Sequence, residues 1–273
     1  MRRRTDARMP QMWAAWIWRW AVLAVGLGLW EVWARGERSP FFPPPTRIAA
    51  QMYRLWFSGP VDHLFLTQDA IDDILPSLAR IVAGFTVATV IGIVAGIAIA
   101  RSPVLADYLD PILQFCRALP VVALVPVFLA FLKIGTQMEV VTIAFGAVWP
   151  VLLNTADGVA SVDPLKLDTA RAFRLSPRER LTALIIPAAL PKIFAGMRIG
   201  VSISLILMVI SELVGATEGI GYALNNASTS FDLPSLWAAI ALLGILGYLL
   251  NGLLLLAERR LLTWHHGAYQ RTP

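Results

Sequence analysis

The sequence predicts an all-α membrane protein with about six transmembrane helices, and three observations support this fold class. Of the 273 residues, 57% are hydrophobic and 15% are charged, and the mean hydropathy is +0.65, values typical of an integral membrane protein. Residues 81–100 are an uncharged run between Arg80 and Arg101, long enough to cross a hydrocarbon core of roughly 30 Å. The single cysteine, Cys116, excludes an internal disulfide and is interpreted as a small core residue.

The first predicted span covers residues 13–34 and has tryptophans at both ends, as the aromatic belts of a membrane helix do. These are Trp13, Trp16, Trp18 and Trp20 at one end, and Trp30 and Trp33 at the other. Prolines between residues 40 and 45 exclude a helix there, and residues 46–57 are expected to form a short surface helix.

The second predicted span, residues 81–100, carries small residues at every fourth position. They are Gly84, Ala88, Gly92, Gly96 and Ala100. Spaced in this way they form a smooth stripe along one helix face, which allows a neighbouring backbone to approach closely. The alternative is that membrane helices simply tolerate glycine. Five small residues in register favour close helix packing.

The remaining spans are predicted at residues 112–132, 138–156, 193–214 and 236–257. The segment 112–132 contains Pro120 and Pro126 within the short stretch that separates Arg117 from Lys133. A broken, short helix is tolerated in a membrane only where protein or a water-filled cavity surrounds it. We therefore interpret this segment, including Val121, as an inner element beside the transport pathway.

Polar side chains inside the spans are further candidates for the pathway, because such groups are costly unless they pair or line water. Glu212 lies near the outer end of the fifth span, and either structural pairing or a pathway role would explain it. Asn154 and Asn251 are expected to make hydrogen bonds between helices. Arg198 is expected to reach the cytoplasmic interface with its long side chain.

The distribution of Lys and Arg predicts the topology. Six spans place both termini on one side, and most Lys and Arg residues gather in the two tails and in the loop around residues 157–191. By the positive-inside rule this side is cytoplasmic. We expect one membrane domain, residues 13–262, between cytoplasmic tails at 1–12 and 263–273. The pair His265-His266 belongs to the basic tail, and the net charge of +5 reflects topology rather than nucleic-acid binding.

The cytoplasmic loop has two strong signals for the start of a helix. Asp163-Pro164 is an N-cap followed by a first-turn proline. Ser176-Pro177 repeats that pattern, and Glu179, three residues after Ser176, completes a capping box. Two short helices are therefore expected to meet near Leu175 and Ser176, outside the bilayer, where a partner could bind them.

This loop resembles the cytoplasmic coupling loop of ABC-importer permeases. That pattern runs Glu-Ala-Ala, three residues, Gly, nine residues, then Ile-x-Leu-Pro. Residues 168–170 and 184–187 occupy its first and last elements, and Arg174 stands where the family has glycine. Residues 117–126, 149–155, 219–222 and 77–80 resemble permeases of the aliphatic sulfonate, taurine and nitrate group, whereas Lys133 departs from their usual apolar or glycine residue.

The resemblance implies a type I ABC-importer permease fold in a bacterial inner membrane. Its partners would be a second copy of the chain, cytoplasmic ABC ATPase subunits, a periplasmic or lipid-anchored solute-binding protein and membrane lipid. The solute would be a small organic anion such as an aliphatic sulfonate or taurine, or else nitrate. The residues expected to couple to the ATPase are Asp168, Thr169, Ala170, Arg171, Arg174, Leu175, Ser176 and Pro177. The pathway candidates are Pro120, Val121, Pro126, Asn154 and Glu212.

Motifs for catalysis and for a cofactor or metal site are absent from the sequence. It contains no Gly-x-x-x-x-Gly-Lys-Ser/Thr phosphate-binding loop, so a separate subunit would have to hydrolyse ATP. Its three histidines lie outside the predicted spans, which leaves no base for an intramembrane serine protease. A stand-alone channel or secondary carrier, which would need no ATPase partner, is the alternative to the importer; a membrane-embedded enzyme is the weaker one.

Overall fold

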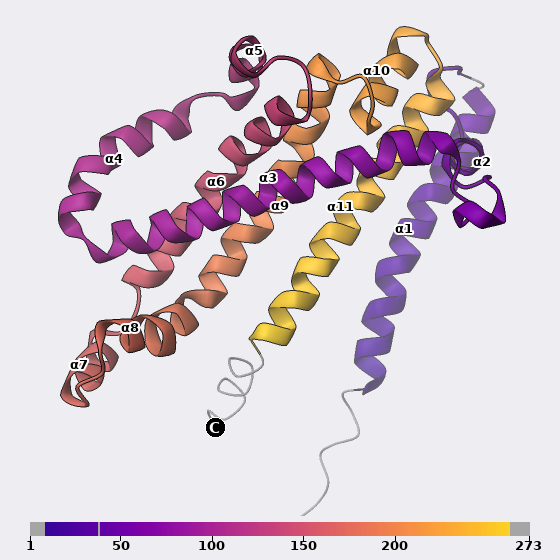
Figure 1. Cartoon of the computed structure of the whole chain (residues 1–273). Coiled ribbons are helices and arrows are strands. Elements are labelled where there is room, and N and C mark those ends of the chain that lie inside the picture. The colour runs from indigo at the N-terminus through magenta and orange to yellow at the C-terminus, as the bar shows by residue number, and fades with distance from the viewer. Residues whose placement is uncertain (1–8, 38, 263–273) are drawn as a thin grey trace, which may run out of the picture.

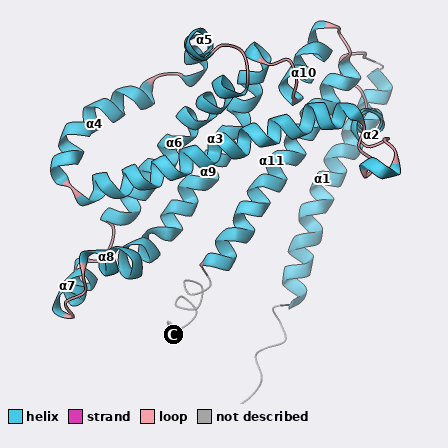
Figure 2. Cartoon of the chain, in the orientation of Figure 1, coloured by secondary structure: helices cyan, strands magenta, loops and turns pink. Residues whose placement is uncertain are grey.

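The computed structural model describes residues 9–37 and 39–262 (Figure 1). Within these ranges the regular structure is helical (Figure 2). The main helices are α1 (Met9–Glu37), α2 (Pro45–Trp56), α3 (Gln68–Arg101), α4 (Pro103–Ala118), α5 (Val121–Leu132), α6 (Thr136–Ala160), α7 (Pro164–Ala172), α8 (Pro177–Glu179), α9 (Ile186–Gly215), α10 (Ile220–Thr229) and α11 (Leu233–Leu261). A 3₁₀ turn, η1 (Val61–His63), precedes α3, and a π-helical segment, η2 (Arg180–Ile185), precedes α9. The predicted C-terminal tail, with His265 and His266, and most of the N-terminal tail lie outside the described residues.

Four segments of the described chain are long and apolar enough to cross a membrane, namely those that contain α3, α6, α9 and α11. The helix pair α4 and α5 makes a fifth if it counts as one broken span. Helix α1, which corresponds to the first predicted span, is not among these segments. The side chains of Trp13 and Trp16 are not described, while Trp18 and Trp33 are exposed, as lipid-facing tryptophans would be.

The predicted third span is broken, but it is not the single element 112–132 that the sequence suggested. Helix α4 starts earlier, after the N-cap Ser102, and α5 meets it at an angle of 93°. The first of the two residues between them is Leu119, which is extended with φ −68° and ψ 127°. Pro120 follows, and a proline pushes the residue before it out of the helical region. The break therefore lies at residues 119 and 120.

The core of the bundle is formed where α3 crosses α6 and α9 (Figure 1). The small-residue stripe lies in this contact, because Gly84, Ala88, Gly92 and Gly96 are all buried. A Cβ atom at Gly84 would lie 2.6 Å from Ile143 Cγ2, and one at Gly92 would lie 2.9 Å from Val151 Cβ. The predicted close packing along this stripe is confirmed, and α6 is the helix that approaches it.

The loop predicted to be cytoplasmic forms one short helix rather than two. Helix α7 has the predicted N-cap, because the N–H of Leu165 donates to Asp163 Oδ1 (2.9 Å). The capping box is also present, with both hydrogen bonds between Ser176 and Glu179. However, α8 is a single turn that continues through η2 into α9, so the second predicted helix is the beginning of a long one. Since Pro187 has no N–H to donate, a wider π-helical turn before it lets the helix continue.

The expected surface helix 46–57 corresponds to α2 and is fixed to the bundle by its last residue. Trp56 is buried, and its Nε1–H donates to Asp73 Oδ2 in α3 (3.0 Å). Asn251 makes the expected hydrogen bond between helices, to Ser202 Oγ in α9 (3.5 Å).

Two other expectations need correction. Arg198, predicted to reach the cytoplasmic interface, pairs with Glu258 of α11. Cys116 is only partly buried, because no residue of α4 is buried within this chain. Both corrections depend on which helices are neighbours, and the sequence of a single span does not specify its neighbours.

Candidate functional site

Helix α7 is the first element of the loop predicted to couple to an ATPase, residues 157–191, which we call the coupling loop. It ends in a turn closed by two backbone hydrogen bonds. The N–H of Arg174 donates to the carbonyl of Arg171 (2.9 Å), and the N–H of Leu175 donates to the carbonyl of Ala170 (3.0 Å). This pair of bonds is a Schellman motif, which places one residue in the left-handed region. That residue is Arg174, with a φ of 55°. Glycine adopts this conformation without a Cβ clash, which explains why the family pattern has glycine at this position.

The other coupling candidates are mostly exposed on α7 and α8. Asp168 and Arg171 form an ion pair on the surface, with 2.8 Å between Oδ1 and Nη1. Thr169 Oγ1 donates to the carbonyl of Leu165 within α7 (2.7 Å). Ala170 is the exception, because its side chain is buried within the chain.

The coupling loop also presents apolar surface. The side chains of Leu165 and Phe173 are 71% and 77% exposed, unusually high values for large apolar groups. A pocket of about 540 Å³ opens between α7 and η2, lined by Phe173, Leu175 and Leu184 among others. The loop therefore combines a rigid, capped backbone with apolar contacts that nothing in this chain covers, as a docking surface would.

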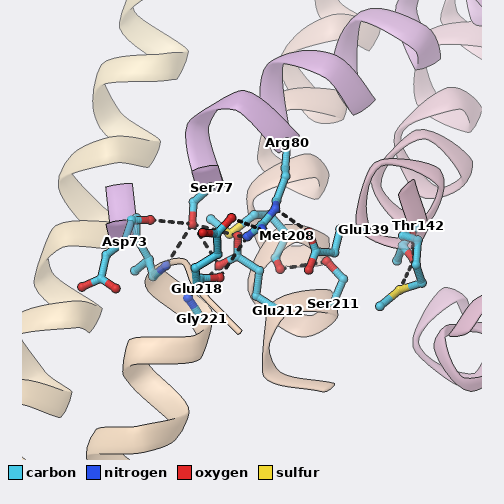
Figure 3. Close-up of polar contacts among 12 residues, drawn as sticks. Asp73, Ser77, Arg80, Glu139, Thr142, Met208, Ser211, Glu212, Glu218 and Gly221 are labelled. Carbon is cyan, nitrogen blue, oxygen red and sulfur yellow. Dashed lines mark hydrogen bonds and ion pairs between the residues drawn. The ribbon is translucent and has the colours of Figure 1, made fainter. Parts of the chain in front are cut away.

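A second site lies at the opposite end of the bundle and is built from charges (Figure 3). We call Arg80, Glu139, Glu212 and Glu218 the Arg80 cluster. Arg80 Nε contacts Glu139 of α6, and Nη1 donates to Glu212 Oε1 of α9 (2.8 Å). Nη2 lies 3.2 Å from Glu218 Oε1, in the turn before α10. The side chains of Arg80, Glu139 and Glu212 are at most 3% exposed, whereas that of Glu218 is 51% exposed.

Glu212 also holds the start of α10. Its Oε2 accepts a hydrogen bond from the N–H of Gly221 (2.8 Å), and both carboxylate oxygens lie within 2.9 Å of Ser77 Oγ. Ser77 Oγ in turn accepts from the N–H of Ile220 (2.9 Å). A carboxylate at a helix N-terminus satisfies free N–H groups and interacts favourably with the helix dipole. The structure therefore shows the structural pairing that was one of the two interpretations of Glu212.

Most of this cluster is not indicated by the sequence. Arg80 stands at the boundary of the predicted span, because the uncharged run begins at residue 81. Helix α3 in fact begins at Gln68 and includes Pro76, so Ser77 and Arg80 lie on the same helix, one turn apart. The signal that could have found the cluster was the segment 77–80, already noted in the resemblance. Glu139 and Glu218 gave no signal of their own.

The other pathway candidates are not brought together with Glu212. Asn154 donates Nδ2–H to the carbonyl of Pro150 in its own helix (2.8 Å), which corrects the expected hydrogen bond between helices. A Cβ atom on Gly196 of α9 would lie 2.6 Å from the carbonyl oxygen of Pro150 and 2.8 Å from Asn154 Cβ. The backbone of α9 at Gly196 therefore packs directly against α6 beside Asn154. Asn154 and Glu139 are 15 residues apart on α6, which places them about 22 Å apart along the helix axis.

The pathway candidates of α5 divide between its two faces. Val121 packs against the apolar cluster that contains Ile143 and Met208. Pro120 forms the N-cap of α5, and Pro126 is exposed. Among the residues that the structure describes, no group of three or more His, Cys, Asp or Glu side chains is arranged to hold a metal. The carboxylates of the Arg80 cluster are instead directed at a guanidinium.

An all-helical bundle with several segments long and apolar enough to cross a membrane places the chain in the class of polytopic helical membrane proteins. The chain belongs to the family described as "Binding-protein-dependent transport system inner membrane component", which matches residues 88–263. It is therefore the permease component of an ABC importer, as both this family and the curated relatives indicate.

Several relatives are similar over most of their length. The nitrate import permease protein of Synechocystis is 33% identical over 84% of this chain and 83% of its own. The taurine transport system permease protein of Escherichia coli is 31% identical over 91% of this chain and 93% of its own. A putative aliphatic sulfonates transport permease protein of Bacillus subtilis is 30% identical over 82% and 78%.

The fold is also found in solved structures. A chain of the MetNI methionine ABC transporter, in an inward-facing conformation, superposes with a TM-score of 0.60 at 19% sequence identity. The match covers 70% of this chain and 95% of that chain. At this identity the similarity establishes the fold alone, and it agrees with the type I importer permease fold that the sequence predicted.

Proposed function

We propose that this chain forms the translocation pathway for a small anion, a sulfonate such as taurine or else nitrate. The support for this solute class is the printed function of three relatives, which are named for nitrate, taurine and aliphatic sulfonates. Solute selection would belong largely to an external binding protein, periplasmic or lipid-anchored. The Arg80 cluster is a poor direct ligand for an anion, because three carboxylates face one guanidinium.

Coupling to ATP hydrolysis is the second part of the proposal, and the observation that carries it is the structure of the coupling loop. Helix α7 is fixed by its N-cap and its Schellman turn, and it presents Phe173 to the outside. A rigid, partly apolar projection of this kind suits insertion into a cleft of a cytoplasmic ATPase. ATP-driven closure of the two ATPases would then move the two α7 helices, and with them the two permease subunits.

A second copy of the chain would complete the pathway. No residue of α4 is buried within this chain, and α4 exposes Val104, Tyr108, Ile112 and Phe115. The N-terminal end of α1 and the C-terminal end of α11 lie toward the same end of the bundle as α7 (Figure 1). This arrangement supports cytoplasmic termini, with α10 and the Arg80 cluster at the external end.

Co-purification and uptake test the proposal together. The chain, solubilised in detergent, is expected to retain an ABC ATPase, and the complex in proteoliposomes should import a sulfonate or nitrate only with ATP and a binding protein. Growth of a deletion strain on single sulfur and nitrogen sources would identify the solute. Uptake by the purified chain alone would instead establish a channel or secondary carrier and reject the importer function.

A substitution at Ala170 tests the docking role of α7. Because Ala170 is buried where α7 meets the rest of the loop, Ala170→Glu should displace α7 and abolish ATP-driven uptake while the protein stays in the membrane. The measurement is uptake together with retention of the ATPase on the purified permease. Ala172→Glu, the same substitution at an exposed position of α7 that does not line the pocket, is the control. Normal coupling in the Ala170 variant would exclude this docking surface.

A further inference from the structure

Helix α10 is attached to the bundle in an unusual way, because its N-terminus is capped by other helices. Its own N-cap, Gly219, provides no side chain, and the first N–H groups are satisfied by Ser77 of α3 and Glu212 of α9. Gly219 has a φ of +114°, and a Cβ atom there would lie 2.6 Å from Glu212 Oε2. The start of α10 therefore rests directly on the carboxylate of Glu212.

The opposite end of α10 is much less enclosed. Asn226, Ser228, Thr229 and Ser230 are exposed, and Ala227 is the only buried residue among positions 222–230. The helix then ends in a tight turn in which Phe231 has a φ of 56° and is 77% exposed. Two tight turns thus bound a ten-residue helix whose hydrogen bonds to α3 and α9 lie at its N-terminal end. Such an element can rotate as a unit when the contacts at its held end change.

Glu218 is the weakest member of the contacts that hold α10. Arg80 donates to both the backbone carbonyl of Glu218 (3.0 Å) and its side-chain carboxylate (3.2 Å). The contacts of Arg80 with Glu139 and Glu212 are fully buried, and breaking them would leave uncompensated charges in a medium of low dielectric. The half-exposed side chain of Glu218, in contrast, can exchange its guanidinium partner for water at small cost.

We propose that α10 is an external gate helix and that the Glu218–Arg80 ion pair holds it closed until the transport cycle opens the external side. Glu139 and Glu212 act as positioning residues, because they fix the guanidinium of Arg80 toward α10. This inference rests on the proposed function, since the gate has meaning only in an ATP-driven importer. It adds residues that the pathway candidates did not include, namely Arg80 and Glu218.

The space beside α10 provides a direct measurement of its movement. A pocket of about 280 Å³ separates α10 from α2, with Trp56 and Leu55 on one side and Tyr222 and Ala223 on the other. A cysteine in place of Ala223, in a Cys116→Ser background, should react faster with a membrane-impermeant thiol reagent when α10 moves outward. A cysteine at the exposed Ser228 reports general loosening, because its reactivity does not depend on this pocket.

The variant that tests the gate is Glu218→Gln, which removes the charge of the half-exposed partner and leaves the buried ion pairs intact. Glu258→Gln is the matched control, because it removes the carboxylate partner of a different arginine, Arg198, in a partly exposed ion pair away from α10. In the reconstituted permease–ATPase complex, Glu218→Gln should raise ATP hydrolysis without binding protein by about threefold, the population shift expected from losing one such ion pair. It should also accelerate labelling at position 223 without ATP, and the control variant should change neither.

Two results would overturn the gate. One is Glu218→Gln with wild-type hydrolysis and wild-type labelling; the other is equal acceleration at positions 223 and 228, which indicates general loosening. In the unsubstituted complex, trapping with ATP should change labelling at 223, a response that a purely structural ion pair would not give. If no ATPase binds the chain, the proposed function fails separately. The ATP-free labelling comparison still tests whether Glu218 holds α10.

Discussion

The coupling loop and the Arg80 cluster lie at opposite ends of the same helices, and their polar contacts have very different ranges in sequence. In the coupling loop, Ser176 bonds Glu179 three residues away, and Asp163 bonds Leu165 two residues away. In the Arg80 cluster, Arg80 donates to Glu212 across 132 residues, and beside the cluster Ile220 donates to Ser77 across 143. The first region is stabilised by local backbone geometry, and the second exists only when three helices have packed.

The comparison predicts different consequences of substitution. Contacts in the coupling loop are exposed, so each is worth little, but together they fix the direction of α7. Contacts in the Arg80 cluster are buried, so the loss of one partner leaves the others uncompensated. We therefore expect the most destabilising substitutions at the cluster and in the core beside it, and the smallest effects in the loop.

The largest effect is expected for Arg80→Met. Removing the guanidinium leaves Glu139 and Glu212 buried without a counter-ion, which costs about 3–5 kcal/mol in comparable cases. Thermal unfolding in detergent and the yield of folded protein measure this loss. Arg171→Met removes a cation from an exposed pair and should change stability by about 0–1 kcal/mol. Equal stability of the two variants would break the comparison between the two regions.

The next effect concerns the core between them. Gly92→Leu should destabilise the bundle by at least about 1–3 kcal/mol, because even a Cβ atom there would lie 2.9 Å from Val151. Val90, two residues away on α3, is exposed, and Val90→Leu should be neutral. Folded yield by size-exclusion chromatography distinguishes the pair. If Gly92→Leu behaves like Val90→Leu, α3 and α6 do not approach as closely as the stripe requires.

A smaller effect is expected in the coupling loop at Ser176. Ser176→Ala removes the side-chain acceptor for the N–H of Glu179 and should cost about 1 kcal/mol, confined to the first turn after the cap. Hydrogen–deuterium exchange of the segment 176–182 is the measurement, with the segment 163–170 as internal control. Faster exchange across the whole protein would show that the cap matters beyond its own turn.

The smallest effect is expected at Arg174 and has the opposite sign. Glycine removes the Cβ strain of a left-handed residue, roughly 1–2 kcal/mol, but loses more entropy on folding, roughly 0.5–1 kcal/mol, so Arg174→Gly should stabilise slightly. A small rise in the unfolding temperature would sharpen the comparison, because it would show that the loop is governed by local backbone preference. A fall in the unfolding temperature of this variant would mean that the Arg174 side chain makes a contact that stabilises the folded protein.

Much of the fold was determined by the sequence alone, because its signals are local. The apolar runs correspond to α3, α6, α9 and α11, and the stripe of Gly84, Ala88, Gly92 and Gly96 identified the packing face of α3. Ser176 and Glu179 form their capping box as expected, since its atoms belong to neighbouring residues. In each case the period of the helix, or the few residues of one turn, contains the whole physical cause.

Only the tertiary structure decided the rest. Arg80 was readable as a charge beside a span, but its three carboxylate partners come from α6, α9 and the turn before α10. Pro120 and Pro187 indicate where the helices are disturbed, but neither residue by itself specifies the 93° angle between α4 and α5 or the continuation of α8 into α9. A buried charge has no low-energy state without a partner, yet the sequence around it does not specify which helix brings that partner.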